Sequence, residues 1–302
     1  MRVVVTGAAG QLGSDLCRVL EEDPRALAWQ GMTRAELDVT NAAQVRAVLR
    51  DQTRPAKIQG GLVVINTAAW TDVDGAESDE AGAYALNASA PGLLAASCAE
   101  VGATLVHIST DYVFPGDAGR PYDVDDPTGP ASAYGRTKLA GEQAVRTVLP
   151  DASYVVRTSW VYGATGGNFV KTMARLEGQR ETLTVVDDQR GCPTWSADLA
   201  RGLVDLAASS AVPGTYHLAG GGETTWYGLA RAVFEELGVD PDRVQPTTSA
   251  EFVRPAPRPA YSVLSSRAWQ AAGLTPLRDW REALTVAFRE VGKQLRGVPA
   301  NR

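Results

Sequence analysis

Apolar residues at the start of the chain change from a continuous run to a helical spacing. Residues 3–5 are consecutive valines, as in a short strand that is buried on both faces. Leu12, Leu16, Val19 and Leu20 follow at a spacing that places them on one face of a helix. The pattern therefore predicts a strand, a turn and an amphipathic helix.

The same alternation continues through the first half of the chain. Apolar or β-branched runs predict further strands at 26–32, 62–65, 104–108 and 154–156. Helical patterns separate them: one after a cap at Thr40, one over the alanine-rich stretch 79–100, and one at 133–148. Repeated strand–helix units form a parallel sheet with helices on both faces. We therefore expect an α/β fold with a doubly wound, Rossmann-type sheet over residues 1–160.

The second half of the chain is less regular. Glycine-rich segments predict loops, and three prolines within residues 255–259 predict an extended segment. Helical patterns recur at 196–208, 225–237 and 280–291. We expect residues 161–302 to form a smaller, loop-rich C-terminal lobe that mainly binds the substrate, with some of this chain returning to the Rossmann sheet.

Composition narrows the choice of partners. A net charge of −6 with both signs dispersed argues against a nucleic-acid or anionic membrane surface. No apolar run reaches the roughly 18 residues that a membrane span needs. Cys17, Cys98 and Cys192 are far apart and odd in number, which favours a reducing cytoplasm over a disulfide framework. With His107 and His217 as its histidines, the sequence gives no zinc-type ligand set.

Three glycines between the first strand and the first helix are the first candidates for a binding site. Gly7 permits a sharp turn, Gly10 lets the backbone approach a pyrophosphate, and Gly13 lets helix and strand pack closely. Gln11 and Leu12 lie at the helix start, where free N–H groups meet phosphate charge. The spacing differs from the usual G-x-G-x-x-G, and a tight turn without a ligand is the alternative. The position between strand and helix favours a dinucleotide.

The end of the second predicted strand bears on the choice of cofactor. Sites that prefer NAD often carry an acidic residue there, which binds the ribose 2′-hydroxyl. Thr33 and Arg34 stand at this point instead, and a guanidinium suits the 2′-phosphate of NADPH. We expect NADPH, with NADH as the alternative if Arg34 is an ordinary solvated charge. Asp38 and Val39 could flank the adenine or only lead into the helix cap.

Small residues follow the third predicted strand, where Ala68 and Ala69 precede Trp70. Ligands of doubly wound sheets bind beyond the carboxyl ends of the strands. Small side chains there would let the ribose and diphosphate of a cofactor lie on the backbone. A close contact between helix and sheet is the alternative explanation.

The candidate catalytic residues lie on the fourth strand and the helix that follows it. Ser109 and Thr110 end the strand, while Tyr134 and Lys138 are four residues apart and so share one helix face. A tyrosine that gives up its proton near neutral pH needs a cation, because its free pKa is about 10. Lys138 could supply that cation and also reach the nicotinamide ribose. Thr110 could hold a carbonyl oxygen in line with the phenol.

Six stretches of the chain together resemble the dTDP-4-dehydrorhamnose reductase family of extended short-chain dehydrogenase/reductases. They are residues 7–13, 68–77, 109–114, 134–142, 157–163 and 188–194. The resemblance covers nearly the whole length. It implies transfer of a hydride from NAD(P)H to the 4-keto carbon of a dTDP-sugar, giving dTDP-L-rhamnose for nucleotide-sugar biosynthesis.

The resemblance also implies roles for single residues. Tyr134 would be the proton donor, Lys138 its partner, and Thr110 and Asp111 substrate contacts. The resemblance further places Trp160 along the sugar.

Two regions concern the diphosphate of the substrate. Asn168 lies in a loop that the resemblance brings to the diphosphate, while Arg254 and Arg258 could be diphosphate ligands or solvated charges. Some family members are described as magnesium-linked dimers, but no acidic cluster in this sequence clearly specifies a Mg²⁺ site. The need for Mg²⁺ therefore stays open, as does the choice between a monomer and a homodimer.

Other functions on the same fold are the alternatives. The 4,6-dehydratases resemble one another in a Thr-Asp-Glu run, whereas here Tyr112 follows Asp111 and the base for elimination is missing. Epimerases keep the tyrosine but hold NAD tightly and return the hydride, and the family resemblance argues against them. The regulatory subunit of methionine adenosyltransferase is similar to this family but acts as a non-catalytic partner. Intact Thr110, Tyr134 and Lys138 argue against that role.

Four other residues are expected to be structural. His107 lies in an apolar strand and is predicted to be a core residue, and Cys192 precedes Pro193 in a tight segment. Asp187 and Asp188 could suggest a metal site, but a solvated turn is favoured.

Overall fold

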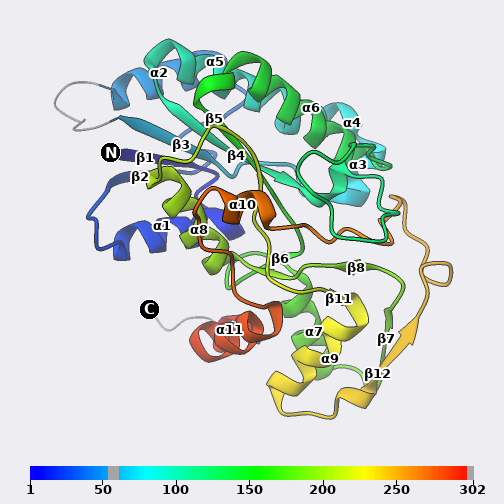
Figure 1. Ribbon diagram of the computed structural model, residues 1–302. Helices are drawn as coiled ribbons and strands as arrows, with labels where there is room; N and C mark the ends of the chain where they lie inside the picture. The colour runs from blue at the N-terminus through cyan, green and yellow to red at the C-terminus, as the bar shows by residue number, and fades with distance from the viewer. Residues whose placement is uncertain (54–60, 298–302) are drawn as a thin grey trace.

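A computed structural model describes residues 1–53 and 61–297 of this protein. Within these ranges a six-stranded sheet runs through the centre in the order β10-β5-β4-β3-β1-β2 (Figure 1). All neighbouring strands are parallel. The strands are β1 (Arg2–Thr6), β2 (Ala28–Met32), β3 (Leu62–Asn66), β4 (Thr104–Thr110), β5 (Ser153–Thr158) and β10 (Gly214–His217). The predicted doubly wound sheet is confirmed. The end of the predicted lobe, 298–302, lies outside the described residues.

The strands send alternate side chains into two helical layers. Val3 and Val5 lie in the core under α1 (Gln11–Glu22) and α8 (Ser196–Ala208). Val4 points the other way, into the core under α2 (Ala42–Gln52), α5 (Ala90–Val101) and α6 (Ala133–Val148). Figure 1 shows these layers on opposite sides of the sheet. Full burial of one such side chain contributes about 1.5–3 kcal/mol, so the valine run holds β1 inside the sandwich.

Two predicted boundaries differ from the structure. The cap of α2 is Asn41, whose Oδ1 accepts a hydrogen bond from the Gln44 backbone N at 3.1 Å. The prediction of Thr40 as the cap is wrong, because the Thr40 hydroxyl and backbone N both donate to Asp38 in the turn before the helix. The strand predicted from residue 26 begins at Ala28, since Ala26 adopts a positive φ of 49°.

The alanine-rich stretch predicted as one helix contains a π-helical turn. Helix α4 (Glu80–Tyr84) leads into the π turn η2 (Ala85–Ser89), which α5 continues. Pro91 has no N–H to donate to the Asn87 carbonyl four residues earlier. That carbonyl lies against Gly141 of α6, where an added Cβ would be 2.1 Å from it. The π turn therefore packs closely on the helix that carries Tyr134.

A further core, separate from the two that flank the sheet, lies below the sheet in Figure 1. It is built by α7 (Phe169–Glu177), α9 (Trp226–Leu237), α11 (Trp280–Leu295) and the parallel pair β7 (Leu183–Val186) and β12 (Val244–Thr247). Two short pairs also belong to this half of the chain: β6 (Val161–Tyr162) with β9 (Thr194–Trp195), and β8 (Arg190–Gly191) with β11 (Thr224–Thr225). Helices predicted at 196–208, 225–237 and 280–291 correspond to α8, α9 and α11. Helix α11 runs past a non-helical Val291.

The two halves of the chain share elements. Helix α8 packs on α1, and β10 pairs with β5, although both come from the second half. Shorter elements are α3 (Val73–Ser78), α10 (Arg267–Ala271), and the 3-10 turns η3 (Asp111–Val113), η4 (Pro150–Ala152) and η5 (Pro241–Arg243). Across the described residues, no helix is long and apolar enough to cross a bilayer.

Candidate active site

The strand order creates a crevice beyond the carboxyl ends of β1 and β3. Helix α1 follows β1 on one face of the sheet, and the chain after β3 covers the other face with α5. Ligands of doubly wound sheets bind where neighbouring connections diverge in this way. The loops after β1, β3 and β4 carry most of the predicted site residues.

Glycine suits each of the three positions in the first loop for a different physical reason. Gly7 has a φ of +69°, and a Cβ there would also lie 2.8 Å from the Ala68 backbone N. A Cβ on Gly13 would lie 2.2 Å from the Gly7 carbonyl oxygen, so helix and loop touch at that point. Gly10 is exposed and forms the cap of α1 without a side chain of its own. Packing therefore requires Gly7 and Gly13, while Gly10 leaves the N–H groups of the helix start open to an anion.

A cavity of about 520 Å³ lies beside this loop. Its volume falls within the roughly 300–1,000 Å³ of small-molecule sites. Eight residues predicted to bind the cofactor are among its walls: Gly7, Gly10, Arg34, Asp38, Val39, Ala68, Ala69 and Trp70. Thr33 precedes Arg34 in the chain but does not line the cavity. Leu12 and Ser109 are not among its walls: the Leu12 side chain is buried in the core, which leaves only its backbone at the start of α1 for a phosphate, and the Ser109 hydroxyl donates to Glu142.

The segment after β2 carries the cation of Arg34 and a carboxylate, Glu36, that is already hydrogen-bonded. Arg34 is exposed and lines the cavity. Glu36 accepts hydrogen bonds from the Thr33 backbone N at 2.8 Å and from its hydroxyl at 2.7 Å. Hydrogen bonds from Thr40 hold the pKa of Asp38 below its ordinary value, and Arg34 adds to this lowering. The carboxylates of Glu36 and Asp38, near Arg34, are thus hydrogen-bonded within local turns.

Tyr134 sits in the first turn of α6 and faces the end of β4. The helix begins there because Ser132 caps it through a hydrogen bond from the Gly135 backbone N at 3.1 Å. Burial raises the pKa of Tyr134 to about 12, against a hydrogen bond with Thr110 that lowers it. The Thr110 side chain therefore lies close enough to Tyr134 to affect the pKa of the phenol. The expected lowering of the Tyr134 pKa is absent here, because burial outweighs its neighbours.

Lys138 lies one turn further along α6 and is 2% exposed. Its Nζ donates to the Ile108 carbonyl of β4 at 2.6 Å. Burial lowers the pKa of Lys138 to about 8, and the Glu142 carboxylate opposes that fall. The lysine is thus held between the helix and the strand that ends in Thr110.

Asp111 follows Thr110 and is also buried. Its Oδ1 accepts a hydrogen bond from the Thr110 hydroxyl at 2.9 Å. Burial raises the pKa of Asp111 to about 6, although hydrogen bonds from Ser262 and Thr110 lower it. A carboxyl group at this position, beside Tyr134, has the surroundings of a substrate contact.

Arg258 reaches the same region from the proline-rich segment. Its Nη1 forms an ion pair with Asp74 Oδ1 at 2.9 Å, and Arg254 pairs with the other oxygen of Asp74. Burial raises the pKa of Tyr112, and the nearby Arg258 cation opposes that rise. Arg258 is therefore not a solvated loop charge: it ties the segment to α3 and lies near Tyr112.

Trp160 adopts a left-handed backbone conformation with a φ of 45°. Its ring stacks on Trp226 with centroids 3.6 Å apart and planes at 7°. A Cβ on Gly191 would lie 2.5 Å from the Trp160 ring, so a larger residue there would displace the indole. A bulky residue at positive φ costs free energy and is found mostly at functional sites. Trp226 was not predicted, because its stacking partner is distant in the sequence.

Asn168 connects the lobe to the glycine loop. It caps α7 by accepting from the Lys171 backbone N, and its Nδ2 donates to Gln11 Oε1 and to the Gly163 carbonyl, both at 2.9 Å. Gln11 donates in turn to the Val161 carbonyl. Asn168 and Gln11 thus both lie at the start of α1, and their side-chain amides are hydrogen-bonded to each other.

Asn87, in the π turn, is a site residue that the sequence did not reveal. Its amide accepts from the Trp70 backbone N at 2.9 Å and donates to the Trp70 carbonyl and the Thr137 hydroxyl. It thereby fixes the loop after β3 to α6, the helix that carries Tyr134 and Lys138. Pro91 four residues later was the available clue, because it interrupts a helix interior.

The residues expected to be structural are buried or hydrogen-bonded. His107 is fully buried in β4 and bonds Asn66 through Nδ1 at 3.1 Å. Burial raises the pKa of Cys192 to about 12, which leaves its thiol protonated. Asp187 and Asp188 accept hydrogen bonds from Thr225 and Ser249. The described residues contain no group of three or more His, Cys, Asp or Glu side chains placed to hold a metal.

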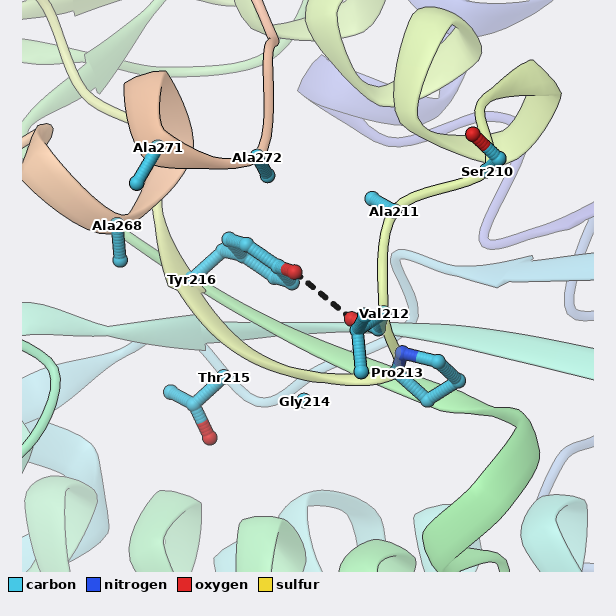
Figure 2. Close-up of a pocket in the computed structure, with 10 residues that line it drawn as sticks. All are labelled: Ser210, Ala211, Val212, Pro213, Gly214, Thr215, Tyr216, Ala268, Ala271 and Ala272. Carbon is cyan, nitrogen blue, oxygen red and sulfur yellow. Dashed lines mark hydrogen bonds between the residues drawn. The ribbon is translucent and has the colours of Figure 1, made fainter.

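Figure 2 shows a separate hollow of about 460 Å³ at the edge of the sheet. It is lined by residues 210–216 and by alanines of α10 and its end. Tyr216 donates from its hydroxyl to the Val212 carbonyl there at 2.7 Å. The hollow adjoins the segment that enters β10, so it lies at the amino end of that strand, away from the end of the sheet that carries Thr110.

The fold and the Thr110–Tyr134–Lys138 group define a nicotinamide-dependent oxidoreductase of the short-chain dehydrogenase/reductase type. A family model described as "RmlD substrate binding domain" matches residues 1–292. The chain is similar to the dTDP-4-dehydrorhamnose reductase of Streptomyces griseus, with 52% identity over 100% of this chain and 98% of that protein. It belongs to this reductase family.

Two further relatives bear on substrate and cofactor. A probable dTDP-4,6-dihydroxy-2-methyloxan-3-one 4-ketoreductase of Streptomyces antibioticus is 52% identical over 96% of each chain. The crystal structure of the dTDP-4-dehydrorhamnose reductase from Bacillus anthracis, in complex with NADP, has a TM-score of 0.89 and 38% identity. It covers 96% of this chain and 99% of its own.

Proposed function

We propose that this protein reduces the 4-keto group of dTDP-4-dehydro-L-rhamnose with NADPH, giving dTDP-L-rhamnose. The observation that carries the proposal is the meeting of Thr110 and Tyr134, with Lys138 one turn further along the same helix. The dTDP-sugar reductases among the relatives support the substrate class.

The residues present fit a nicotinamide dinucleotide. The turn at Gly7 and the exposed cap at Gly10 suit a pyrophosphate, and the cavity beside them has room for a nucleotide. Arg34 on the cavity wall offers a cation to a 2′-phosphate, which supports NADPH over NADH. When bound, the reduced nicotinamide supplies a hydride to the carbonyl carbon.

The chain's own residues handle the proton. Tyr134 donates its phenolic proton to the carbonyl oxygen, and a pKa of about 12 keeps that proton on the phenol at neutral pH. Thr110 would hold the carbonyl oxygen beside the phenol, once its hydroxyl turns from Asp111 to the substrate. The buried Lys138 cation stabilises the phenolate that remains until solvent returns a proton.

The substrate contacts come from both halves of the chain. We infer that residues 1–160 hold mainly the cofactor and residues 161–302 mainly the sugar nucleotide. Asp111 and Trp160 would contact the sugar, while Asn168 and Arg258 would face the diphosphate. Exchange of Arg258 from Asp74 to the diphosphate would be the accompanying rearrangement.

The experiment is a coupled assay that supplies dTDP-4-dehydro-L-rhamnose with NADPH or NADH, with the product identified by NMR. Faster oxidation of NADPH and formation of dTDP-L-rhamnose are expected. A second candidate is reduction of another dTDP-4-keto-6-deoxy sugar, favoured by the similarity to the Streptomyces antibioticus ketoreductase. Oxidation of neither cofactor with either sugar would refute both and favour a non-catalytic binding role.

A further inference from the structure

A buried group of charges lies behind the candidate catalytic residues. Glu142 is one helical turn beyond Lys138 on α6, and both are 2% exposed. Its two carboxylate oxygens accept from Arg157 of β5, at 2.9 Å from Nε and 2.7 Å from Nη2. The Ser109 hydroxyl donates to the same carboxylate at 2.5 Å. Glu142 therefore ties α6 to the ends of two neighbouring strands.

Stability alone does not account for this pair. Removing two charges from water costs several kcal/mol per ion, and apolar pairs of similar volume often serve a core as well. The Arg157 guanidinium also makes a cation–π contact, since it lies 4.9 Å from the Phe114 ring centroid. A buried carboxylate at this place therefore needs a further explanation.

The titratable groups on the elements around Lys138 narrow that explanation. Tyr134 and Glu142 lie on its own helix, His107 lies on β4, Arg157 on β5, and Asp111 follows β4. His107 is kept neutral, because burial and the Lys138 charge lower its pKa well below the ordinary value. Arg157 carries the same charge as Lys138. Glu142 is the carboxylate that favours the charged form of the lysine.

Ser109 gives Glu142 a second connection to the site. It stands between Ile108, whose carbonyl accepts from Lys138, and Thr110, whose side chain lies near Tyr134. The hydrogen bond from Ser109 to Glu142 therefore fixes the strand segment on which both contacts depend.

We propose that Glu142 is a positioning residue for the reduction: held by Arg157 and Ser109, its carboxylate keeps the Lys138 side chain charged and directed at the end of β4. This inference rests on the proposed role of Lys138 as the partner of Tyr134. Turnover that needs a charged lysine falls as pH rises through the lysine pKa. Loss of the carboxylate lowers that pKa and moves the fall to lower pH.

The test compares the pH dependence of kcat in variants, with unfolding followed by circular dichroism. Glu142→Gln should shift the high-pH fall in kcat downward by roughly one to two pH units, as expected for a nearby buried charge. The double variant Glu142→Gln, Arg157→Met removes both charges, so it leaves no unpaired ion that would unfold the protein. It should show a smaller shift in the same direction.

Two controls separate the possible outcomes. Glu80→Gln removes an exposed carboxylate that pairs with Arg136 of α6, and its profile should match the parent. Lys138→Met should abolish the high-pH fall itself; if that fall persists, the proposed role of Lys138 is wrong. If Lys138→Met removes the fall but a folded double variant leaves its position unchanged, Lys138 keeps its role and the inference about Glu142 is overturned.

Discussion

The rings of Tyr112 and Tyr134 meet edge to face, with centroids 5.6 Å apart and planes at 77°. Burial raises the pKa of both phenols, so both are protonated at neutral pH. They differ in their surroundings, because the Thr110 side chain lowers the pKa of Tyr134, while Asp111 adds to the rise for Tyr112. The two tyrosines therefore form a matched pair for testing which phenol gives its proton to the substrate.

Tyr134→Phe should lower kcat by roughly 100- to 10,000-fold, the usual contribution of general acid catalysis. NADPH affinity should stay close to that of the parent, since the phenol is not needed to hold the cofactor. Tyr112→Phe is the control and should keep most of the activity. Steady-state kinetics and NADPH titration check both, and a Tyr134→Phe enzyme with near-parent kcat would remove Tyr134 as the donor.

The glycines of the first loop should respond differently to an added methyl group. Gly13→Ala places a Cβ 2.2 Å from the Gly7 carbonyl oxygen, and the overpacking should cost about 1–3 kcal/mol of unfolding free energy. Gly10→Ala meets its nearest atom at 3.1 Å in a backbone conformation open to alanine. It should lose less unfolding free energy than Gly13→Ala, about 1 kcal/mol at most for a poorer helix cap, and it should lose NADPH affinity. Equal NADPH affinity in Gly10→Ala and the parent would show that this position does not face the pyrophosphate.

Arg34→Ala tests the preference for NADPH. A charge-assisted hydrogen bond contributes about 1.5–3 kcal/mol, so NADPH should bind roughly tenfold or more weakly. NADH, which has no 2′-phosphate, should bind almost as before. Arg46→Ala, an exposed arginine on α2 that pairs with Glu100, is the control. An equal loss for both cofactors would count against Arg34 as the selecting residue.

Asp111 should make stability depend on pH. Its pKa in the folded protein is about 6 against an ordinary 3.8, so its stabilising contribution is complete below the ordinary value and is lost as pH rises through about 6. Asp111→Asn should therefore unfold at a higher temperature than the parent near pH 7.5, by up to about 3 kcal/mol in free energy, and differ little near pH 4. Thermal unfolding at both pH values checks the sign.

Activity should change in the opposite direction. If Asp111 contacts the sugar, Asp111→Asn should raise KM for the dTDP-sugar while it raises stability. An enzyme with an unchanged KM would show that the buried carboxyl group is not a substrate contact.

The sequence was most informative where local rules act. The valine run, the glycine spacing and the Tyr134–Lys138 interval each depend on residues within one strand, turn or helix, and the structure confirms the elements that they predicted. The choice of Asn41 over Thr40 as a cap was missed, since it depends on which side chain Asp38 already engages.

Contacts between distant segments were harder to predict. Trp226 stacks on Trp160, and Asp74 binds Arg254 and Arg258, only because the fold brings their segments together. Periodicity holds no information on such pairs. Burial of Tyr134 likewise raised a pKa that a nearby lysine was expected to lower, because desolvation depends on the whole surrounding core.

The return of α8 and β10 to the sheet has a consequence for biosynthesis. A nascent chain that has just completed β5 has no partner for that strand's outer edge, and the apolar face of α1 lacks its cover. Both are supplied only when synthesis has passed His217. Residues 1–160 therefore cannot mature on the ribosome ahead of the rest of the chain, and a fragment cut near residue 160 should aggregate rather than fold on its own.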